Sequence, residues 1–486
     1  MKVLFAVAEA VPYVKTGGLA DVAGALPAAL RGLGHDVRLV LPRYRAVSPA
    51  GLDRAQPLRL PIGGRTVEGA VLTTTSPAGV PVYFVDCPPF FDRPGVYGDG
   101  VRDYEDNLVR FAFFSQAALV VAETLFAPDL VHAHDWHAAL VAAYVHRRRC
   151  TRQPAWPVLF TVHNVAMQGV FPGEQFGFLG LPAEYFTPEG LEFWGQVNCL
   201  KAGLVYADVL STVSETYARE IQTPEYGAGL DGVLRRRSAD LFGVLNGVDY
   251  TRWDPRVAPH LPARYGPDDL EGKRRCKRAL QRERGLRPLP YAPLVGMVSR
   301  LTEQKGCDLV TAVLPWLVAQ GAQFVLLGTG EARYQERFEA LARAHPRRVA
   351  VAFGFDEPLA HRIEAGADFF LMPSRFEPSG LNQLYSMRYG TLPVVRRTGG
   401  LADSVVDATP DAVAQGRATG FVFDAYAPEA LQTALSRALA AYRDGPTWYR
   451  LQQTAMRQDF SWDRSARRYA DLYALTVERA QAAALH

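Results

Sequence analysis

The sequence predicts an α/β protein with two doubly wound parallel sheets, one in each half of the chain. Two observations indicate this fold class. Short apolar runs alternate with amphipathic helical patterns along both halves, as in parallel sheets covered by helices. The string Thr-Gly-Gly-Leu-Ala-Asp also occurs twice, at residues 16–21 and 398–403, each time between an apolar run and a helical pattern. The repeat predicts two related nucleotide-fold halves, each directing a glycine-rich turn at one shared cleft.

The first half begins with a strand, a glycine-rich turn and a helix. Apolar residues recur from Leu19 to Leu30 with the spacing of an amphipathic helix, and Gly32 ends the pattern. The expected strands of this half cover residues 3–7, 37–41, 82–85, 130–133 and 158–162.

The second half resumes the alternation after a proline-rich break that has neither strand nor helix periodicity, which places a domain boundary near residue 245. We expect a Rossmann-like N-terminal domain over 1–245 and a Rossmann-like C-terminal domain over 246–460. A C-terminal helix within 461–486 is expected to pack back toward the first domain. The expected strands of the second half cover residues 294–298, 324–327, 349–353, 369–372 and 392–395.

The composition argues against several classes of protein. The net charge is only +3, and the basic runs lie far apart without interleaved aromatic residues, so nucleic acid is not an expected partner. The five cysteines contain no C-x-x-C pair, which indicates neither a disulfide framework nor a thiolate zinc site and fits a reducing cytoplasm. Glu9 interrupts the apolar N-terminus, so a secretory signal is not expected. No run reaches the roughly 18 apolar residues of a membrane span.

The repeated glycine turns could each hold an anion. Adjacent glycines let the backbone approach a ligand, and the free N–H groups at a helix start favour negative charge. A plain tight turn would explain a single copy. Two copies, preceded by Lys15 and Arg397, favour ligand binding.

Cations follow two expected strands of the second half, where open parallel sheets bind ligands. Arg300 and Lys305 come after one strand, and Arg375 and Glu377 come after another. A guanidinium fork and an ammonium suit a diphosphate. We interpret the group as a phosphate site, although Arg300 alone would be a surface cation.

Three histidines lie close together at 132, 134 and 137 in the first half. The run is similar to the H-x-H-x-D-H pattern of binuclear zinc hydrolases, but its aspartate has the wrong offset, so no metal site is predicted. Asp135 and Trp136 are interpreted as residues for sugar hydroxyls and ring stacking. His163 and Asn164, which end another strand, are expected to face the same cleft.

Two other enzyme classes fit poorly. The sequence has no D-x-D triplet, through which single-sheet glycosyltransferases hold a nucleotide diphosphate with a metal ion. Arginine, lysine and helix dipoles must then take the place of the metal. Glu377 has no acidic partner in its motif, which argues against a paired-carboxylate glycosidase.

Nearly end to end, the chain resembles the bacterial and plant-type glycogen and starch synthases, retaining glycosyltransferases of the GT-B fold that use ADP-glucose. The motifs that carry the resemblance are Lys15-Thr16-Gly17-Gly18-Leu19-Ala20-Asp21, His132-Ala133-His134-Asp135-Trp136-His137, Thr161-Val162-His163-Asn164, Asn246-Gly247-Val248-Asp249, Ser299-Arg300-Leu301 with Lys305-Gly306, Pro373-Ser374-Arg375-Phe376-Glu377-Pro378 and Arg396-Arg397-Thr398-Gly399-Gly400-Leu401-Ala402-Asp403.

The resemblance implies a role for each motif. Lys15 and Gly18 would approach the donor from the first domain, Arg300 and Lys305 would hold its diphosphate, and Phe355 would stack on adenine. The catalytic residues that it implies are Asp135, His163, Arg300, Lys305 and Glu377. The substrate-binding residues that it implies are Lys15, Thr16, Gly17, Gly18, Asp21, Tyr97, Asn164, Asn246, Phe355, Ser379, Gly380, Leu381, Asn382 and Tyr385. It implies neither a metal nor another cofactor.

The chain departs from related patterns at two places. Tyr385 stands where related retaining transferases carry a second glutamate eight residues after Glu377, as the synthase branch would have it. Ser379 and Asn382 stand where many synthases have cysteine and threonine, and both keep hydrogen-bonding capacity.

We therefore expect a cytoplasmic enzyme that transfers glucose from ADP-glucose to the non-reducing 4-hydroxyl of an α-1,4-glucan such as glycogen, with retention of configuration. Departure and attack on one face is the expected mechanism, and a covalent Glu377 adduct is the alternative. Nucleic acid and membrane are not expected partners. Two other hypotheses remain: a non-catalytic glucan-binding regulatory protein of the same fold, and a zinc-dependent hydrolase.

Overall fold

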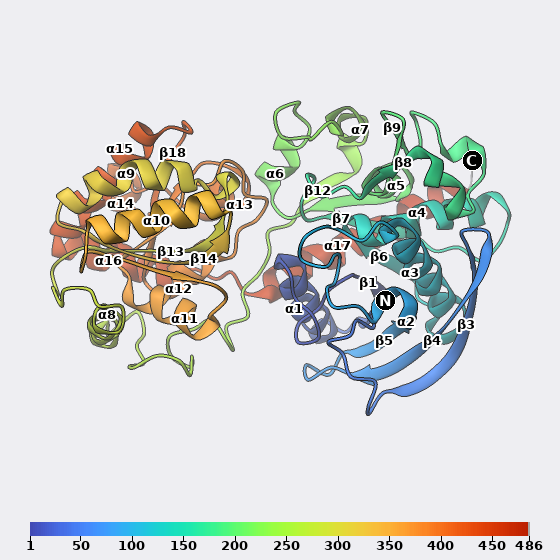
Figure 1. Cartoon of the computed structure of the whole chain (residues 1–486), viewed down its shortest axis with the longest axis horizontal. Helices are drawn as coiled ribbons and strands as arrows, with labels where there is room; N and C mark the ends of the chain where they lie inside the picture. Colours follow the sequence, from blue (N-terminus) through green and yellow to red (C-terminus); the bar gives the residue numbers. More distant parts are fainter. Residues whose placement is uncertain (485–486) are drawn as a thin grey trace. The chain divides into compact units, whose positions relative to one another are not determined.

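Residues 1–484, described by the computed structural model, fall into two units (Figure 1). Unit 1 contains Met1–Gly247 and the C-terminal helix α17 (Trp462–Ala484), and unit 2 contains Val248–Ser461. The chain therefore passes between the units twice, after Gly247 and after Ser461.

Unit 1 alternates strands and helices along the chain. Its strands are β1 (Lys2–Ala6), β2 (Asp36–Pro42), β3 (Asp53–Ile62), β4 (Arg65–Thr75), β5 (Pro81–Asp86), β6 (Leu130–His134), β7 (Val158–Val162), β8 (Val170–Pro172), β9 (Glu192–Phe193), β10 (Gln196–Asn198), β11 (Val209–Thr212) and β12 (Leu241–Gly243). Its helices before α17 are α1 (Gly18–Gly32), α2 (Pro88–Phe91), α3 (Asn107–Val121), α4 (Asp135–Cys150), α5 (Cys199–Tyr206), α6 (Glu215–Glu220) and α7 (Asp231–Arg236), with shorter helical turns η1 (Ala122–Phe126), η2 (Gly173–Leu179), η3 (Ala183–Tyr185) and η4 (Ser238–Asp240).

Over the described residues, the main sheet of unit 1 has nine strands in the order β12-β11-β7-β6-β1-β2-β5-β4-β3. Seven of them, from β12 to β5, are parallel, whereas β4 and β3 form an antiparallel hairpin at one edge. A separate three-stranded antiparallel sheet has the order β8-β10-β9. The sequence predicted neither this small sheet nor the β3–β4 hairpin.

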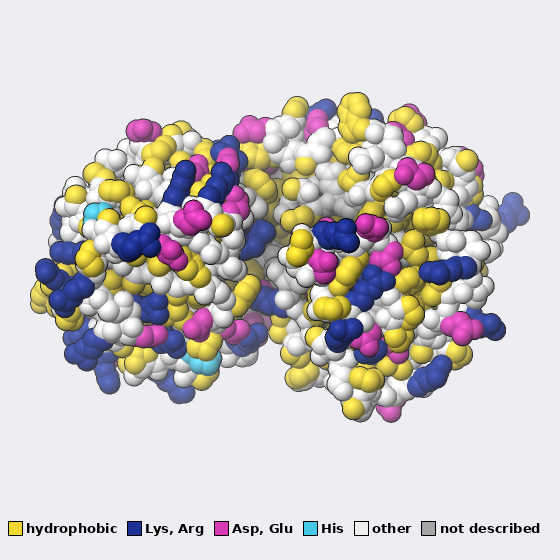
Figure 2. Space-filling model, viewed as in Figure 1, with side chains coloured by type: hydrophobic (Ala, Val, Ile, Leu, Met, Phe, Trp, Pro, Cys, Tyr) yellow, Lys and Arg dark blue, Asp and Glu magenta, His cyan; other side chains and the backbone are white. Residues whose placement is uncertain are grey.

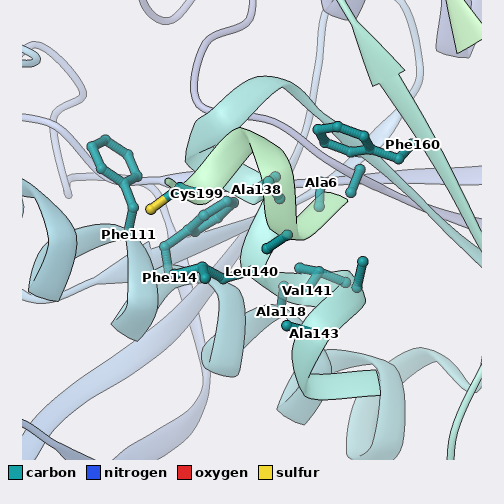
Figure 3. Close-up of a cluster of buried hydrophobic side chains, with 14 of the residues drawn as sticks. Ala6, Phe111, Phe114, Ala118, Ala138, Leu140, Val141, Ala143, Phe160 and Cys199 are labelled. Atoms are coloured by element: carbon teal, nitrogen blue, oxygen red, sulfur yellow. The ribbon is translucent and has the colours of Figure 1, made fainter. Parts of the chain in front are cut away.

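Both faces of the parallel sheet are buried. Side chains alternate along a strand, so Leu4 and Ala6 of β1 pack on one side while Val3 and Phe5 pack on the other. The first side is covered by α3, α4 and α5, whose core side chains are drawn in Figure 3. The second side is covered by α1 and α17. The last helix of the chain is thus part of the first unit's core.

Unit 2 contains a parallel sheet. Over the described residues this sheet has six strands in the order β15-β14-β13-β16-β17-β18. The strands are β13 (Leu294–Leu301), β14 (Gln323–Gly330), β15 (Val349–Phe353), β16 (Phe369–Met372), β17 (Leu392–Arg396) and β18 (Phe421–Phe423). The helices are α8 (Glu271–Glu283), α9 (Cys307–Ala319), α10 (Ala332–Ala344), α11 (Glu357–Gly366), α12 (Asn382–Arg388), α13 (Gly399–Ser404), α14 (Pro410–Ala414), α15 (Pro428–Arg443) and α16 (Gly445–Met456), with the turn η5 (Glu303–Lys305).

The predicted fold class, two doubly wound α/β units, is confirmed. β7, β15 and β16 begin and end at the predicted residues, and the other strands predicted from apolar runs extend the runs by a few residues or shift by one. The helix predicted after the first glycine turn, α1, ends at Gly32 as expected.

One helical stretch of the described residues, Asn107–Phe126, has the length and hydropathy of a membrane span. It consists of α3 and η1, and 67% of its apolar window is buried inside the structure.

On the face drawn in Figure 2, Lys and Arg side chains are interspersed with Asp and Glu, in keeping with the small net charge.

Candidate active site

The first glycine turn is organised around the carboxylate of Glu9, which follows β1. The backbone N–H groups of Thr16 and Gly17 donate to Glu9 Oε2 at 2.5 and 3.2 Å, and the Thr16 hydroxyl donates to Oε1 at 2.5 Å. Tyr97 also donates to Oε1, at 2.5 Å. Glu9 is buried. A carboxylate from the chain itself therefore occupies the two N–H groups at the start of this turn.

Lys15, at the entrance of the same turn, is half exposed. Its ammonium lies 2.8 Å from the carboxylate of Asp21, in the first turn of α1. Gly18 begins α1 and is exposed, and a Cβ added there or at Gly17 would meet no atom within 4 Å. The surface of the turn is open to a ligand even though its inner N–H groups are occupied.

The histidine cluster at the end of β6 is held by neighbours from β7 and α17. The two nitrogens of His132 lie 2.9 Å from the Tyr473 hydroxyl and 2.7 Å from the Thr161 hydroxyl. His134 Nδ1 lies 2.9 Å from Nε2 of His163. Burial lowers the pKa of His163 to about 3, so this pair is neutral at physiological pH.

His137 stacks on the ring of Tyr97 with centroids 4.6 Å apart, and burial lowers its pKa to about 3. Among residues 1–484, no three His, Cys, Asp or Glu side chains are grouped to hold a metal ion. Because both nitrogens of His132 are hydrogen-bonded to hydroxyls, this imidazole is engaged in the fold. The arrangement thus gives the zinc hydrolase hypothesis no support.

Asp135 begins α4 in a conformation that is rare for a residue with a side chain, with φ of +54°. Its carboxylate accepts a hydrogen bond from the His163 N–H at 2.7 Å. Burial, together with the charge of Glu9, raises the pKa of Asp135 to about 7, despite the N–H donors of His163 and Asn164. The structure thus brings Asp135, His163, Asn164, Glu9 and Tyr97 together in unit 1.

A hollow of about 750 Å³ opens beside Trp136, the residue after Asp135. Tyr104, Met167 and Phe171 line it, with polar side chains that include Gln168. Gly169, with φ of +60°, passes so close under the indole that a Cβ there would lie 2.3 Å from Trp136 Cε3. This glycine lets the loop after His163 and Asn164 reach the hollow.

In unit 2, Lys305 and Glu377 form an ion pair at the carboxyl ends of neighbouring strands β13 and β16. The ammonium lies 2.8 and 2.6 Å from the two carboxylate oxygens. The Ser374 hydroxyl donates to Oε2 of Glu377 at 2.9 Å. Glu377 is buried and Lys305 is partly buried. A cation and a carboxylate are therefore fixed in contact, as their strand-end positions suggested.

The second glycine turn supports the Glu377 loop. The N–H of Gly400 donates to the carbonyl of Glu377 at 3.1 Å. A Cβ on Gly399, whose φ is +44°, would lie 1.9 Å from the same carbonyl oxygen. A Cβ on Gly400 would likewise lie 2.0 Å from the carbonyl oxygen of Ser379, so both glycines are required for the close approach of two backbone segments.

Arg300 is the next-to-last residue of β13 and its side chain is exposed. Its guanidinium lies 3.4 Å from Gln304 Oε1. Arg375 is also exposed, pairs with Glu303 at 2.7 Å and covers the Tyr426 ring at 4.2 Å. The weak contact of Arg300 leaves its guanidinium available for an anionic ligand.

The remaining predicted site residues, most of them in unit 2, have varied surroundings. Asn382 donates to the carbonyl of Val298 at 2.7 Å, and Ser379 is buried. Gly380 has φ of +68° and Leu381 precedes α12. The ring of Phe355 is 88% exposed, whereas the ring of Tyr385 stacks on Trp253 with centroids 4.0 Å apart. Asn246 is buried at the end of unit 1.

Glu9 is the main site residue that sequence reasoning missed. In the sequence, Glu9 was noted only because it interrupts the apolar N-terminus. Its position just after β1, at the edge where ligands of parallel sheets bind, was the signal that could have identified it. What could not be read from the sequence is that Glu9 and Tyr97 meet.

Comparison with known proteins gives two family matches. A family model described as the starch synthase catalytic domain matches residues 2–236, and one described as glycosyl transferases group 1 matches residues 287–449. The glycogen synthase of Anaeromyxobacter dehalogenans is 52% identical over 97% of this chain and 98% of its own. Glycogen synthase 1 of Methylococcus capsulatus is 47% identical over 97% of this chain and 96% of its own.

Solved structures agree with these matches. The catalytic domain of Starch Synthase IV from Arabidopsis thaliana, solved with ADP and acarbose bound, superposes with a TM-score of 0.90 at 34% identity, covering 98% of this chain and 99% of that one. A sucrose-phosphate synthase from Thermosynechococcus elongatus shares the fold, with a TM-score of 0.62 at 18% identity and 98% of each chain covered. The resemblance stated from the motifs is confirmed: the chain belongs to the glycogen synthase family of GT-B glycosyltransferases.

Proposed function

We propose that the protein transfers glucose from ADP-glucose to the non-reducing 4-hydroxyl of an α-1,4-glucan, with retention of configuration at the anomeric carbon. The observation that carries the proposal is the Lys305–Glu377 pair beside Arg300, at the carboxyl ends of β13 and β16. It combines the cations that a diphosphate requires with a carboxylate that can face a positively charged sugar. The ADP in the Starch Synthase IV structure supports an adenine nucleotide as donor.

The roles in unit 2 follow from where charge develops in the reaction. The leaving ADP gains negative charge, so Arg300 and Lys305 are placed by our proposal on its phosphates, where preorganised cations stabilise the transition state. The sugar becomes oxocarbenium-like, and the Glu377 carboxylate stabilises that charge. Phe355, Ser379, Gly380, Leu381 and Asn382 are proposed to contact the nucleotide.

The contacts of Glu377 favour departure and attack on one face over a covalent adduct. Both carboxylate oxygens accept hydrogen bonds from the Lys305 ammonium, and one accepts a further bond from Ser374. Such bonds hold the carboxylate in place and withdraw electron density from the oxygen that a nucleophile would use. We therefore propose an electrostatic role for Glu377.

Unit 1 is proposed to bind the glucose ring and the glucan. His163, Asp135 and Asn164 lie together and offer donors and acceptors for sugar hydroxyls. Lys15, with the open turn around Thr16, Gly17, Gly18 and Asp21, would meet the donor phosphates. The hollow beside Trp136 is proposed to receive the acceptor chain, since aromatic faces and polar edges suit sugar rings. A cytoplasmic location is part of the proposal.

An assay of ADP release with a glycogen primer tests the proposed function. We expect release that depends on both ADP-glucose and primer, and competition with UDP-glucose should favour the adenine donor. A non-catalytic glucan-binding protein would bind glycogen and release no ADP. Release of UDP from UDP-glucose, with no release of ADP from ADP-glucose, would make UDP-glucose the donor instead.

A further inference from the structure

An exposed tryptophan forms the tip of the β9–β10 hairpin in unit 1. Phe193 and Gln196 pair across the hairpin, so Trp194 and Gly195 are its two-residue loop. The φ angles of these two residues are +54° and +78°. Loops of this kind favour Asn, Asp or Gly at the first position, because a bulky side chain is strained at positive φ. Trp194 is thus an unfavourable choice for the turn that it makes.

Trp194 gains little from burial in return. Its side chain is 86% exposed, and its ring meets Phe193 edge-on with centroids 6.5 Å apart. Phe193, in contrast, packs toward the core of unit 1. A large apolar side chain held outward in a strained conformation indicates a role outside folding.

The hairpin is rigidly anchored beneath this tryptophan. The buried ammonium of Lys201 on α5 donates to the carbonyls of Glu192 and Pro188 at 2.5 and 2.6 Å. The Glu192 carboxylate accepts the N–H of Gly195 at 2.6 Å. A fixed aromatic face loses little freedom when a ligand settles on it.

The hairpin is also continuous with the hollow beside Trp136. β10 pairs with β8, which supplies Val170, Phe171 and Pro172 to the wall of that hollow. β8 and β9 flank β10 in this small sheet, and β8 and β9 are labelled close together in unit 1 in Figure 1. The Gly195 carbonyl lies so close to Gly173, the residue after β8, that a Cβ there would be 2.3 Å away. Strands are spaced about 4.8 Å apart, which puts β9 roughly 10 Å from the wall of the hollow.

We propose that Trp194 is a second contact for the glucan, an aromatic platform on which sugar rings stack after the chain leaves the hollow beside Trp136. This inference rests on the proposed function, which places the acceptor chain in that hollow. An aromatic face is amphipathic and suits the apolar face of a sugar ring. Because the two contacts lie on one rigid unit, a chain long enough to reach both is held more tightly than a short one.

The test compares glycogen binding by wild type and by Trp194→Asn, a change that suits the turn. We expect the variant to be as stable as wild type or more stable, and its dissociation constant for glycogen to rise roughly tenfold. Thermal unfolding and affinity electrophoresis in gels containing glycogen measure the two effects. Because the variant is expected to lose affinity without losing stability, a folding defect cannot produce the result. Trp194→Phe should restore part of the affinity.

Tyr291→Asn is the matched control, because Tyr291 is 90% exposed and belongs to unit 2. It should leave glycogen binding unchanged. In the transfer assay, Trp194→Asn should raise KM for glycogen more than KM for maltotriose. Equal glycogen affinity in wild type and Trp194→Asn would overturn the inference.

The remaining outcomes separate this inference from its rivals. If wild type self-associates in sedimentation, Trp194→Asn does not, and both bind glycogen equally, the tip contacts a second copy and our assignment is wrong. If wild type transfers glucose while the variant binds glycogen normally, only the second contact fails. If wild type releases no ADP with maltotriose or glycogen, the proposed function itself fails.

Discussion

The Lys305 ammonium lies within hydrogen-bonding distance of both carboxylate oxygens of Glu377, at 2.8 and 2.6 Å. The pair joins the carboxyl ends of adjacent strands, so neither group can shift without the other. Phosphate of a bound donor would share the ammonium with Glu377. A change at either residue is therefore expected to alter the surroundings of the other.

Replacing Arg300 or Lys305 by Ala should lower turnover. Each change should remove about 2–4 kcal/mol of transition-state stabilisation. Both cations are proposed to meet charge that grows on the leaving ADP. Arg300→Ala should leave the unfolding temperature unchanged, because the side chain is exposed and weakly bonded. Steady-state kinetics and thermal unfolding measure the two effects. Arg343→Ala, a change of an exposed arginine on α10, is the control, and wild-type turnover in Arg300→Ala would contradict the phosphate assignment.

Glu9→Gln should reduce both turnover and stability. One amide oxygen cannot replace two carboxylate oxygens that accept four hydrogen bonds, and the amide N–H groups would face the donors of the turn. Leaving buried donors without partners costs about 1–3 kcal/mol. Denaturant unfolding measures this loss, and Tyr97→Phe in both backgrounds measures the coupling between the residues. Additive effects of the two changes would show that Glu9 does not organise Tyr97.

Asp135→Asn should become increasingly stabilising, relative to wild type, as pH rises from about 4 to about 7. The pKa of Asp135 is raised from 3.8 to about 7 in the folded protein. The folded state therefore binds the proton more tightly, and ionisation above pH 4 costs folding free energy that reaches on the order of 4 kcal/mol at high pH. Urea unfolding at pH 5 and pH 8 measures the difference.

The buried histidines titrate in both proteins, so their contribution cancels in this comparison. A stability difference between Asp135→Asn and wild type that is the same at pH 5 and pH 8 would mean that Asp135 is ionised normally. The variant should also be nearly inactive, because Asp135 is proposed to contact the sugar.

Exhaustive chelation should leave the transfer rate intact. The prediction rests on the engagement of His132 by Tyr473 and Thr161 and of His134 by His163, and on the cations proposed for the diphosphate. Activity before and after treatment with chelators, with added zinc or manganese as a second arm, measures the effect. Loss of activity that either metal restores would assign a metal to this cluster.

Lys15→Gln should lower turnover while the affinity for free ADP stays close to wild type. Lys15 belongs to unit 1, whereas the cations proposed for ADP belong to unit 2. Its contribution should therefore appear mainly in the transition state, after both units have engaged the donor. Calorimetric titration with ADP and single-turnover kinetics separate the two quantities. An equal loss in both would place Lys15 in the ADP site of the resting enzyme.

Apolar periodicity predicted most of the fold, because buried parallel strands are nearly continuous hydrophobic runs. The runs at 349–353 and 369–372 became β15 and β16 without change. The β8-β10-β9 sheet was missed because its strands are two or three residues long and have no period to detect. The amphipathic β3–β4 hairpin was missed because its exposed polar residues obscure the run.

The site was predictable to the extent that its residues follow strands. Lys305 and Glu377 follow β13 and β16, and the structure joins them. The contact of Glu9 with Tyr97 spans 88 positions of sequence, and no local pattern records it. The first glycine turn was predicted to bind an anion through its N–H groups. In the structure, the N–H groups of Thr16 and Gly17 instead donate to the carboxylate of Glu9, a contact that the motif alone does not reveal.

The position of α17 has a consequence for how the chain folds during synthesis. This helix covers one face of the unit 1 sheet, yet it is made after all of unit 2. At about 5–20 residues per second, the ribosome needs tens of seconds to make unit 2, and Val3, Phe5 and Leu159 lack their final cover throughout that time. Unit 2 is one uninterrupted segment and can complete its core first. The unit that begins the chain is therefore the last to finish folding.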